Sequence, residues 1–151
     1  MSNRKEEIKK RFDSLAGQRD KWIARNRYYY DDQARYFRFL IPEGMSVLEL
    51  GCGTGDLLNA LKPGRGAGID ISPEMIKVAK EKHPHLEFRQ GNIEELASRD
   101  ETFDFIVMSD VVGHLQDIEE TLRGFRSFCR PDTRIIISYY NFLWEPVLKS
   151  G

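Results

Sequence analysis

Short apolar runs alternate with helix-type segments between residues 46 and 139, and this alternation constrains the fold more than any other feature of the sequence. The runs are SVLEL (46–50), GAGID (66–70), LEFRQ (86–90), FDFIVMS (103–109) and TRIIISY (133–139). The fourth and fifth are nearly continuous in apolar residues, as is typical of parallel strands buried on both faces. Strands that alternate with helices form right-handed βαβ units, so we expect an α/β fold with a doubly wound parallel sheet.

Capping residues mark where the intervening helices begin and end. Ser72 followed by Pro73 predicts an N-cap and a first helical turn, and that helix should stop at His83, which precedes a proline. Asp117 predicts the N-cap of a later helix, which should continue to the segment Arg130-Pro131-Asp132.

The composition excludes several classes of protein. The 151 residues suffice for one domain, and the formal net charge of -1 gives no global field for binding nucleic acid. No apolar run approaches the roughly 18–20 residues that span a bilayer. The charged N-terminus does not resemble a signal peptide, and two cysteines fit a reducing compartment. We therefore expect a cytoplasmic protein without a membrane span.

The N-terminal segment differs from the rest of the chain. Residues 1–39 hold 11 Lys and Arg against 6 Asp and Glu, a net charge of +5, and they are rich in Trp, Tyr and Phe. A basic face with stacking aromatics can bind nucleic acid, but the interspersed acids would weaken its field. Amphipathic helices that lay aromatic side chains on the body are the better interpretation.

A glycine-rich turn follows the first run. Residues 47–56 read VLELGCGTGD, so a strand leads into a turn that opens a helix, where backbone N–H groups can meet a ligand. A dinucleotide fingerprint has its third glycine where this chain has Asp56. The carboxylates of Asp56 and Glu49 disfavour a pyrophosphate and favour a ligand that carries an ammonium group. A purely structural corner is the alternative.

A further carboxylate ends the second run. Asp70 follows Gly51 by 19 residues, at the position where an acid can accept hydrogen bonds from both hydroxyls of a ribose. Asp70 alone could equally cap the next helix. Together with Glu49 and the glycine turn, it indicates a nucleoside site at the topological switch point of an open sheet.

In these residues the chain resembles class I S-adenosylmethionine-dependent methyltransferases. The resemblance covers about residues 45–139, where ELGCGTG is followed by GIDIS, GNIEEL and FDFIVMSD in the order of the family. It implies a Rossmann-like sheet of strand order 3-2-1-4-5 and S-adenosylmethionine as the cofactor. The implied cofactor-binding residues are Glu49, Gly51, Cys52, Gly53, Gly55, Asp70, Ile71, Met75, Asn92, Ile93 and Ser109.

Within this set, the resemblance assigns the methionine part of the cofactor to Glu49 and the turn, and the ribose to Asp70. Asn92 departs from the family, which often has Asp there, but an amide oxygen can still accept a hydrogen bond from the adenine N6. Ser109 is expected to offer its backbone carbonyl to the same amino group.

The two ends of the chain carry weaker indications. The N-terminal segment, with Phe12-Asp13, Arg19-Asp20, Trp22 and RYYY at 27–30, resembles leaders of bacterial methyltransferase domains encoded with or fused to glycosyltransferases. That resemblance implies a fused or neighbouring glycosyltransferase as a partner. The family fold usually adds a helix and an antiparallel hairpin after the fifth strand. Only five residues follow Pro146, so we expect this hairpin to be missing and the core to be truncated at its C-terminus.

His114 is the candidate catalytic residue, since it follows the fourth strand, where the family places groups near the transferred methyl group. A histidine there could take a proton from the acceptor, although a loop histidine bonded to backbone is the competing interpretation. Asp110 has the same two interpretations. No spacing of His and Cys suits a metal, so we expect none.

The sequence therefore predicts methyl transfer from S-adenosylmethionine to a small-molecule, lipid-linked or glycan-linked acceptor. Residues 1–42 would form a helical lid over a cofactor-binding core at 43–151, with Arg19, Arg25 or Arg27 available for the carboxylate of the cofactor. Two alternatives stay open. One is a cofactor-binding but catalytically incomplete module of a larger protein, and the other, less favoured, is an NAD-type oxidoreductase.

Overall fold

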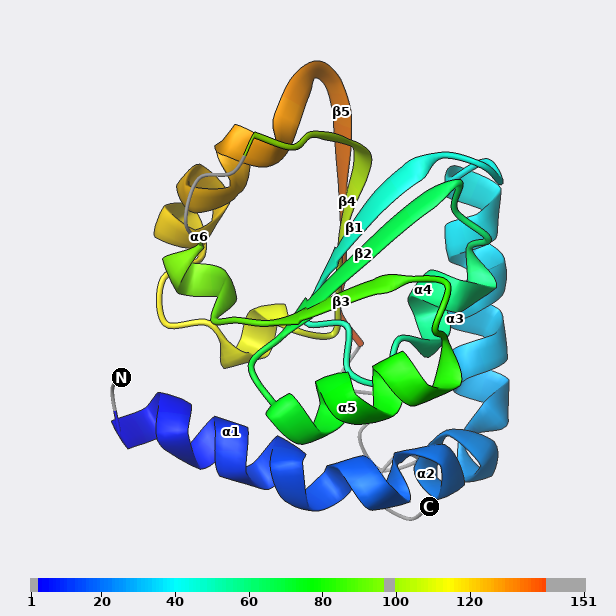
Figure 1. Cartoon of the computed structure of the whole chain (residues 1–151), viewed down its shortest axis with the longest axis vertical. Coiled ribbons are helices and arrows are strands. Elements are labelled where there is room, and N and C mark those ends of the chain that lie inside the picture. Colours follow the sequence, from blue (N-terminus) through cyan, green and yellow to red (C-terminus); the bar gives the residue numbers. More distant parts are fainter. Residues whose placement is uncertain (1–2, 97–99, 141–151) are drawn as a thin grey trace.

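The computed structural model describes residues 3–96 and 100–140, and it contains a five-stranded parallel sheet (Figure 1). The strand order β3-β2-β1-β4-β5 confirms the predicted topology. The order reverses between β1 and β4, which places the switch point at their carboxyl ends. The strands are β1 (Ser46–Leu50), β2 (Arg65–Asp70), β3 (Glu87–Gln90), β4 (Phe103–Ser109) and β5 (Cys129–Ser138).

Helices precede the sheet and connect its strands. The N-terminal ones are α1 (Asn3–Leu15), the 3-10 helix η1 (Ala16–Gln18), α2 (Arg19–Arg25) and α3 (Arg27–Leu40). The connecting ones are α4 (Asp56–Ala60), α5 (Pro73–Lys82), η2 (Ile93–Glu95), η3 (Val112–His114), α6 (Ile118–Gly124) and η4 (Phe125–Phe128).

Both predicted N-caps are present. The Ser72 hydroxyl accepts a hydrogen bond from the Met75 N–H at 3.1 Å, and the Asp117 carboxylate accepts one from the Glu120 N–H at 2.9 Å. The helix after Asp117 is shorter than expected, because it tightens into the 3-10 helix η4 after Gly124.

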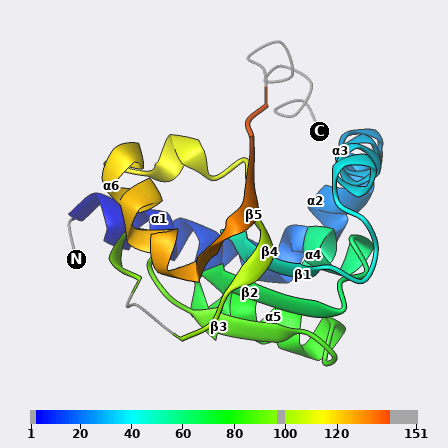
Figure 2. The same ribbon diagram turned by 90° about the horizontal axis from the view of Figure 1, so that it is seen from above.

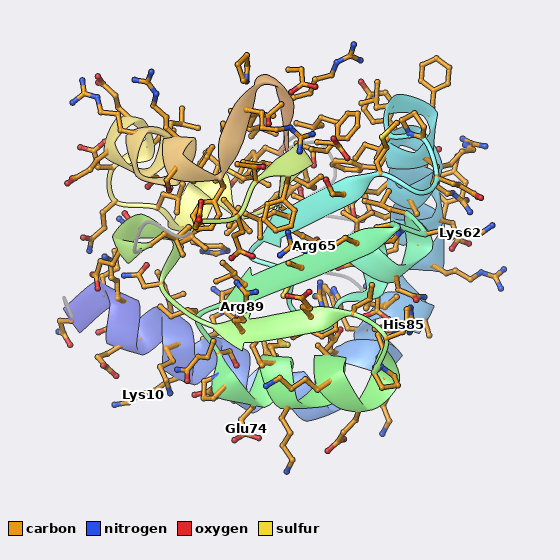
Figure 3. All side chains as sticks on the ribbon, turned by 45° about the horizontal axis from the view of Figure 1, so that its top comes forward. Lys10, Lys62, Arg65, Glu74, His85 and Arg89 are labelled. Carbon is orange, nitrogen blue, oxygen red and sulfur yellow. The ribbon has the colours of Figure 1, made fainter. Side chains whose placement is uncertain are left out.

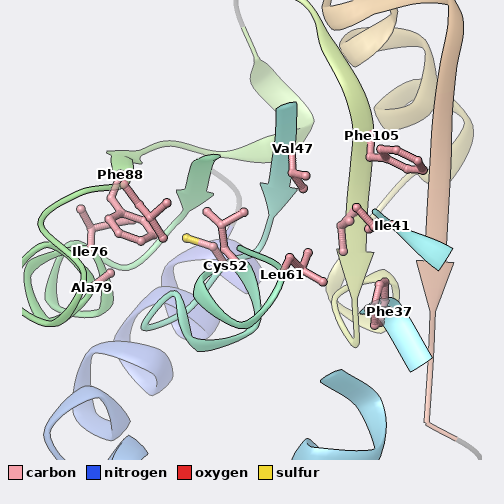
Figure 4. Close-up of a cluster of buried hydrophobic side chains, with 12 residues drawn as sticks. Phe37, Ile41, Val47, Cys52, Leu61, Ile76, Ala79, Phe88 and Phe105 are labelled. Carbon is pink, nitrogen blue, oxygen red and sulfur yellow. The ribbon is translucent and has the colours of Figure 1, made fainter. Parts of the chain in front are cut away.

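Alternate residues of the central strands face two separate cores, as a doubly wound sheet requires. Val47 and Phe105 pack with α3, α4 and α5 on one face, in the cluster shown in Figure 4. Leu48 and Ile106 pack on the other face with Phe125 and Phe128 of η4. The period of two along β1 and β4 thus divides the apolar residues between both layers of helices.

The fifth strand differs from the prediction. It begins at Cys129, earlier than expected, and includes Pro131 at a register irregularity opposite Phe103 and Phe105. Proline is tolerated there because β5 is an edge strand. The prediction that this strand is buried on both faces is wrong, since Ile135 is 44% exposed and Ile137 is 45% exposed.

Charged side chains lie at the β3 edge of the sheet, opposite to β5. Arg65 on β2 and Arg89 on β3 both pair with Glu101, and Arg89 also pairs with Glu87 (Figure 3). Charges of this kind discourage edge-to-edge association of a β-strand with another chain.

The N-terminal helices cross the end of the sheet where the strands finish. In Figure 1, α1 runs below α5 and the strand ends, and in Figure 2 α2 and α3 continue along the flank. Hydrogen bonds and ion pairs join these helices to the loops that follow β2, β3 and β4.

Candidate functional site

The glycine turn between β1 and α4 contains three residues with left-handed backbone. Gly51, Gly53 and Gly55 have φ values of 79°, 51° and 77°. A Cβ at Gly51 would lie 2.6 Å from Val111, and one at Gly55 would lie 2.5 Å from Phe88. A Cβ at Gly53 would meet nothing within 4 Å. Gly51 and Gly55 are therefore needed for packing, whereas Gly53 exposes its backbone to open space.

Asp70 joins the end of β2 to this turn. Its Oδ2 accepts a hydrogen bond from the Gly53 N–H at 2.8 Å, and its Oδ1 accepts one from the Ser72 N–H at 2.9 Å. Burial raises the pKa of Asp70, while the two backbone donors and the charge of Arg19 oppose that rise. Each carboxylate oxygen keeps a second lone pair for an incoming hydroxyl.

Glu49 lies beneath the turn on β1. Its side chain is buried and accepts a hydrogen bond from the Leu58 N–H of α4 at 3.1 Å. Burial raises the pKa of Glu49 to about 8, and the nearby charges of Asp56 and Asp70 contribute to the rise. Glu49 is therefore mostly protonated at neutral pH in the free protein.

Asp56 has a cationic partner within the chain. Its carboxylate accepts hydrogen bonds from the Lys82 ammonium and from the Thr54 hydroxyl, both at 2.5 Å. Burial favours a higher pKa for Asp56, but these donors outweigh it and lower the pKa. Asp56 therefore already has a cationic partner, whereas the buried carboxyl group of Glu49 forms no ion pair with any described residue and is the one left for a ligand ammonium group.

The residues assigned to the adenine follow the ends of β2 and β3. Met75 and Ile93 are buried, and Ile71 is half-buried. The Asn92 carboxamide oxygen accepts a hydrogen bond from the Glu94 N–H at 3.1 Å, as the N-cap of η2. The buried Asn92 Nδ2 has no partner among the described residues, and the carboxamide oxygen keeps a second lone pair, so both ends of this side chain can still meet a ligand.

The other predicted residues lie nearby. The Cys52 thiol is buried against the Gly68 position, and burial raises its pKa well above the usual range. The Ser109 hydroxyl, at the end of β4, accepts a hydrogen bond from the Ser138 hydroxyl at 3.2 Å.

His114 lies in η3, against the N-terminal helices. Its ring meets Phe12 of α1 edge-on, with centroids 5.3 Å apart. Burial lowers the pKa of His114, and the charges of Arg11 and Arg4 lower it further. The described contacts of this imidazole are thus with α1.

Asp110 accepts hydrogen bonds from two side chains of α3, which the sequence did not indicate. It adopts a left-handed backbone with φ of 56°, directly after β4. Its Oδ2 accepts hydrogen bonds from the Tyr29 hydroxyl at 2.6 Å and from Gln33 Nε2 at 3.0 Å. Sequence reasoning missed Tyr29 and Gln33, and only their i,i+4 spacing on a helix suggests that they act together.

The N-terminal helices contact the loops around the site through several polar pairs. Lys5 pairs with Glu94 at 3.3 Å, Asp13 accepts a hydrogen bond from the Ser72 hydroxyl at 2.6 Å, and Asp20 pairs with Lys82 at 2.5 Å. Of the three arginines predicted to reach the cofactor, Arg19 influences the pKa values of both Glu49 and Asp70. Arg27 instead pairs with Asp31, and its side chain is 81% exposed.

The parallel sheet, the glycine turn at its switch point and the carboxylate at the end of β2 together define a Rossmann-like, nucleoside-binding protein. A family model described as a methyltransferase domain matches residues 22–148. The chain therefore belongs to the family of class I S-adenosylmethionine-dependent methyltransferase domains.

Two curated relatives and one solved structure illustrate the similarity. The chain is 31% identical to the demethylmenaquinone methyltransferase of Chlorobaculum parvum over 106 residues, which cover 68% of this chain and 44% of the relative. It is 34% identical to the ubiquinone biosynthesis O-methyltransferase of Azorhizobium caulinodans over 120 residues, with coverages of 75% and 46%. The chain thus spans about half the length of these relatives.

The solved structure is the putative methyltransferase in a complex with the Trm112 methyltransferase activator of Haloferax volcanii. It superposes with a TM-score of 0.71 and is 28% identical, and the match covers 85% of this chain and 59% of that one.

No described helix is long and apolar enough to cross a membrane. Within residues 3–96 and 100–140, no group of three or more His, Cys, Asp or Glu side chains is arranged to hold a metal ion.

Proposed function

We propose that this chain binds S-adenosylmethionine at the glycine turn and transfers its methyl group to a small-molecule acceptor. The observation that carries the proposal is the 2.8 Å hydrogen bond between the Gly53 N–H and Asp70, because it joins an open backbone surface to a ribose-type carboxylate. The similarity to a demethylmenaquinone methyltransferase and to a ubiquinone biosynthesis O-methyltransferase supports a small-molecule acceptor.

The described residues fit the cofactor part by part. Glu49 offers an uncompensated buried carboxyl group to the amino group, Asp70 offers two oxygens to the ribose, and Asn92 Nδ2 offers a donor to a ring nitrogen of the adenine. The cofactor supplies a methyl group that is already activated on a sulfonium. The chain therefore needs to contribute mainly binding, orientation and exclusion of water.

Two alternatives are separated from this proposal by one experiment. An NAD-type oxidoreductase would need a third glycine where this chain has Asp56, whose side chain is held by Lys82 and Thr54. A catalytically incomplete module would bind the cofactor without turnover. Calorimetric titration with S-adenosylhomocysteine and with NADH, followed by a methyl-transfer assay, distinguishes all three. We expect binding of the first ligand only, and binding of NADH instead would refute the proposal.

Other predictions from the sequence stand beside this one. A lid at residues 1–42, a core at 43–151, a cytoplasmic location and a neighbouring glycosyltransferase all stay predictions. The residues expected to end the core, after Tyr140, lie outside the described residues.

Cofactor affinity should depend on pH through Glu49. The free carboxyl group has a pKa of about 8, and an ammonium group beside it favours the charged form. The pKa of Glu49 should therefore fall on binding, with release of a proton below pH 8, so affinity for S-adenosylhomocysteine should rise roughly tenfold or more from pH 6 to pH 8. Calorimetry in two buffers of different ionisation enthalpy measures the proton release. Glu49→Gln should flatten the profile, and a flat profile in the unmodified protein would exclude this role.

Arg19 tests whether the N-terminal helices take part in binding. Its charge acts on both Glu49 and Asp70, and a charged hydrogen bond to the cofactor carboxylate would contribute about 1.5–3 kcal/mol. Arg19→Ala should therefore weaken S-adenosylhomocysteine binding about tenfold or more. Binding of 5′-methylthioadenosine, which lacks the amino-acid part, should not change.

The matched control for this variant is Arg27→Ala, since Arg27 lies nearby in the chain and pairs with Asp31. Equal losses for both ligands in Arg19→Ala would show that Arg19 stabilises the fold rather than contacts the carboxylate.

A further inference from the structure

A groove of about 560 Å³ lies between α3 and the ends of β4 and β5. Aromatic side chains line it from both sides: Tyr29, Tyr36 and Phe39 come from α3, and Tyr139 and Tyr140 follow β5. In Figure 2, α3 and the end of β5 lie on the same side of the sheet. The volume suits a small organic molecule, and aromatic walls favour a planar one that can stack.

One buried oxygen on the groove lining lacks a hydrogen-bond donor. Asp110 Oδ2 accepts from both Tyr29 and Gln33, but Asp110 Oδ1 is buried and has no partner among the described residues. A buried carboxylate oxygen without a donor is costly, so native structures normally provide one. A ligand with a hydroxyl or amine group would supply that donor.

The charges of the groove restrict the ligand further. Among the described residues that line the groove, Arg35 is the one cation, and it pairs with Asp32 on the same helix. Asp110 has no described cationic partner, so the end of the ligand that reaches it cannot carry a carboxylate or phosphate without repulsion. The groove therefore favours a molecule that is neutral at this end.

The groove adjoins the cofactor turn. Val111, the residue after Asp110, packs directly on Gly51, where an added Cβ would lie 2.6 Å from its side chain. A ligand hydrogen-bonded to Asp110 would thus lie beside Val111, the residue through which the loop after β4 contacts the glycine turn.

We propose that this groove binds the methyl acceptor as a planar, uncharged aromatic molecule, whose donor group hydrogen-bonds to Asp110 Oδ1. Tyr29 and Gln33 act as positioning residues, because both donate to the other oxygen and hold the carboxylate in place. Burial and the hydrogen bond to Asp110 raise the pKa of Tyr29 well above its usual range, so it stays a phenol and a donor. The assignment to the acceptor rests on the proposed function.

The test compares two probes on the full chain, 2-naphthol and 2-methoxynaphthalene, of which only the first has a donor. Ligand-observed NMR titration should show 2-naphthol binding about tenfold more tightly. In Asp110→Asn, Tyr29 and Gln33 keep the amide oxygen at the Oδ2 position and place Nδ2 at the Oδ1 position. The preference for 2-naphthol should then disappear, and asparagine tolerates the positive φ of this residue.

A second pair of variants tests the aromatic wall. Tyr36→Ala should weaken binding of both probes about fivefold or more, whereas Tyr28→Ala, on the same helix but outside the groove lining, should change it less than twofold. Thermal unfolding checks that each variant is folded.

Titration with S-adenosylhomocysteine in the same samples separates the two proposals. Cofactor binding without 2-naphthol binding, or an unchanged preference for 2-naphthol in folded Asp110→Asn, would overturn the groove assignment alone. Binding of 2-naphthol without cofactor binding would keep an aromatic site and refute the proposed function.

Discussion

Replacement of Gly53 by valine is expected to reduce affinity for S-adenosylhomocysteine at least a hundredfold while the fold is retained. The added side chain would point into open space, since a Cβ at Gly53 meets no atom within 4 Å. That space is where the cofactor must approach the backbone, so the valine would exclude the ligand rather than clash with the protein. Calorimetric titration measures the affinity, and circular dichroism reports the secondary structure.

Gly44→Val is the matched control for this experiment. Gly44 also has a left-handed backbone, with φ of 83°, and also has nothing within 4 Å of an added Cβ. It lies before β1, at the amino end of the strand. Both variants should lose about 1–2 kcal/mol of stability through the unfavourable φ, but only Gly53→Val should lose cofactor binding. Equal affinities in the two variants would exclude the turn as the binding surface.

Removal of the Asp70 carboxylate should weaken S-adenosylhomocysteine binding by about 1.5–3 kcal/mol, the usual contribution of hydrogen bonds to a charged group. Asp70→Ala deletes the carboxylate that we propose accepts hydrogen bonds from the ribose. It also leaves the Gly53 and Ser72 N–H groups without their acceptor, so the turn should become less ordered and stability should fall. Calorimetry and thermal unfolding separate the two effects.

Asp104→Ala provides the comparison for Asp70→Ala. The Asp104 carboxylate also accepts a hydrogen bond from a backbone N–H, that of Ser46, at 2.7 Å. Asp104 lies near the beginning of β4, far along the strand from the predicted site. Its removal should lower the unfolding temperature without weakening the binding of S-adenosylhomocysteine. Similar affinities for Asp70→Ala and Asp104→Ala would contradict a ribose contact at Asp70.

The agreement between sequence and structure is closest where local pattern decides the result. β1 and β4 have the predicted boundaries, and Ser72 and Asp117 cap the predicted helices. Apolar periodicity and capping act over a few residues, so they can be read directly from the chain.

The prediction was wrong where burial depends on a neighbouring element. An apolar run such as IIIS suits a strand covered on both faces, yet Ile135 and Ile137 of β5 are about half exposed. The sequence of the strand contains no information about whether a helix covers it. The same holds for Pro131, which an edge position tolerates and a central strand would not.

By itself, the sequence determined the class of the fold and the position of the glycine turn. Local backbone geometry sets the spacing of the glycines, the length of the strands and the number of residues between Gly51 and Asp70. Only the tertiary structure decided which side chains complete the site. Tyr29 and Gln33 reach Asp110 across 81 and 77 residues of chain, and burial rather than a neighbour in sequence raises the pKa of Glu49. Such contacts depend on how whole elements pack, because desolvation and long-range hydrogen bonds exist only once the chain has folded.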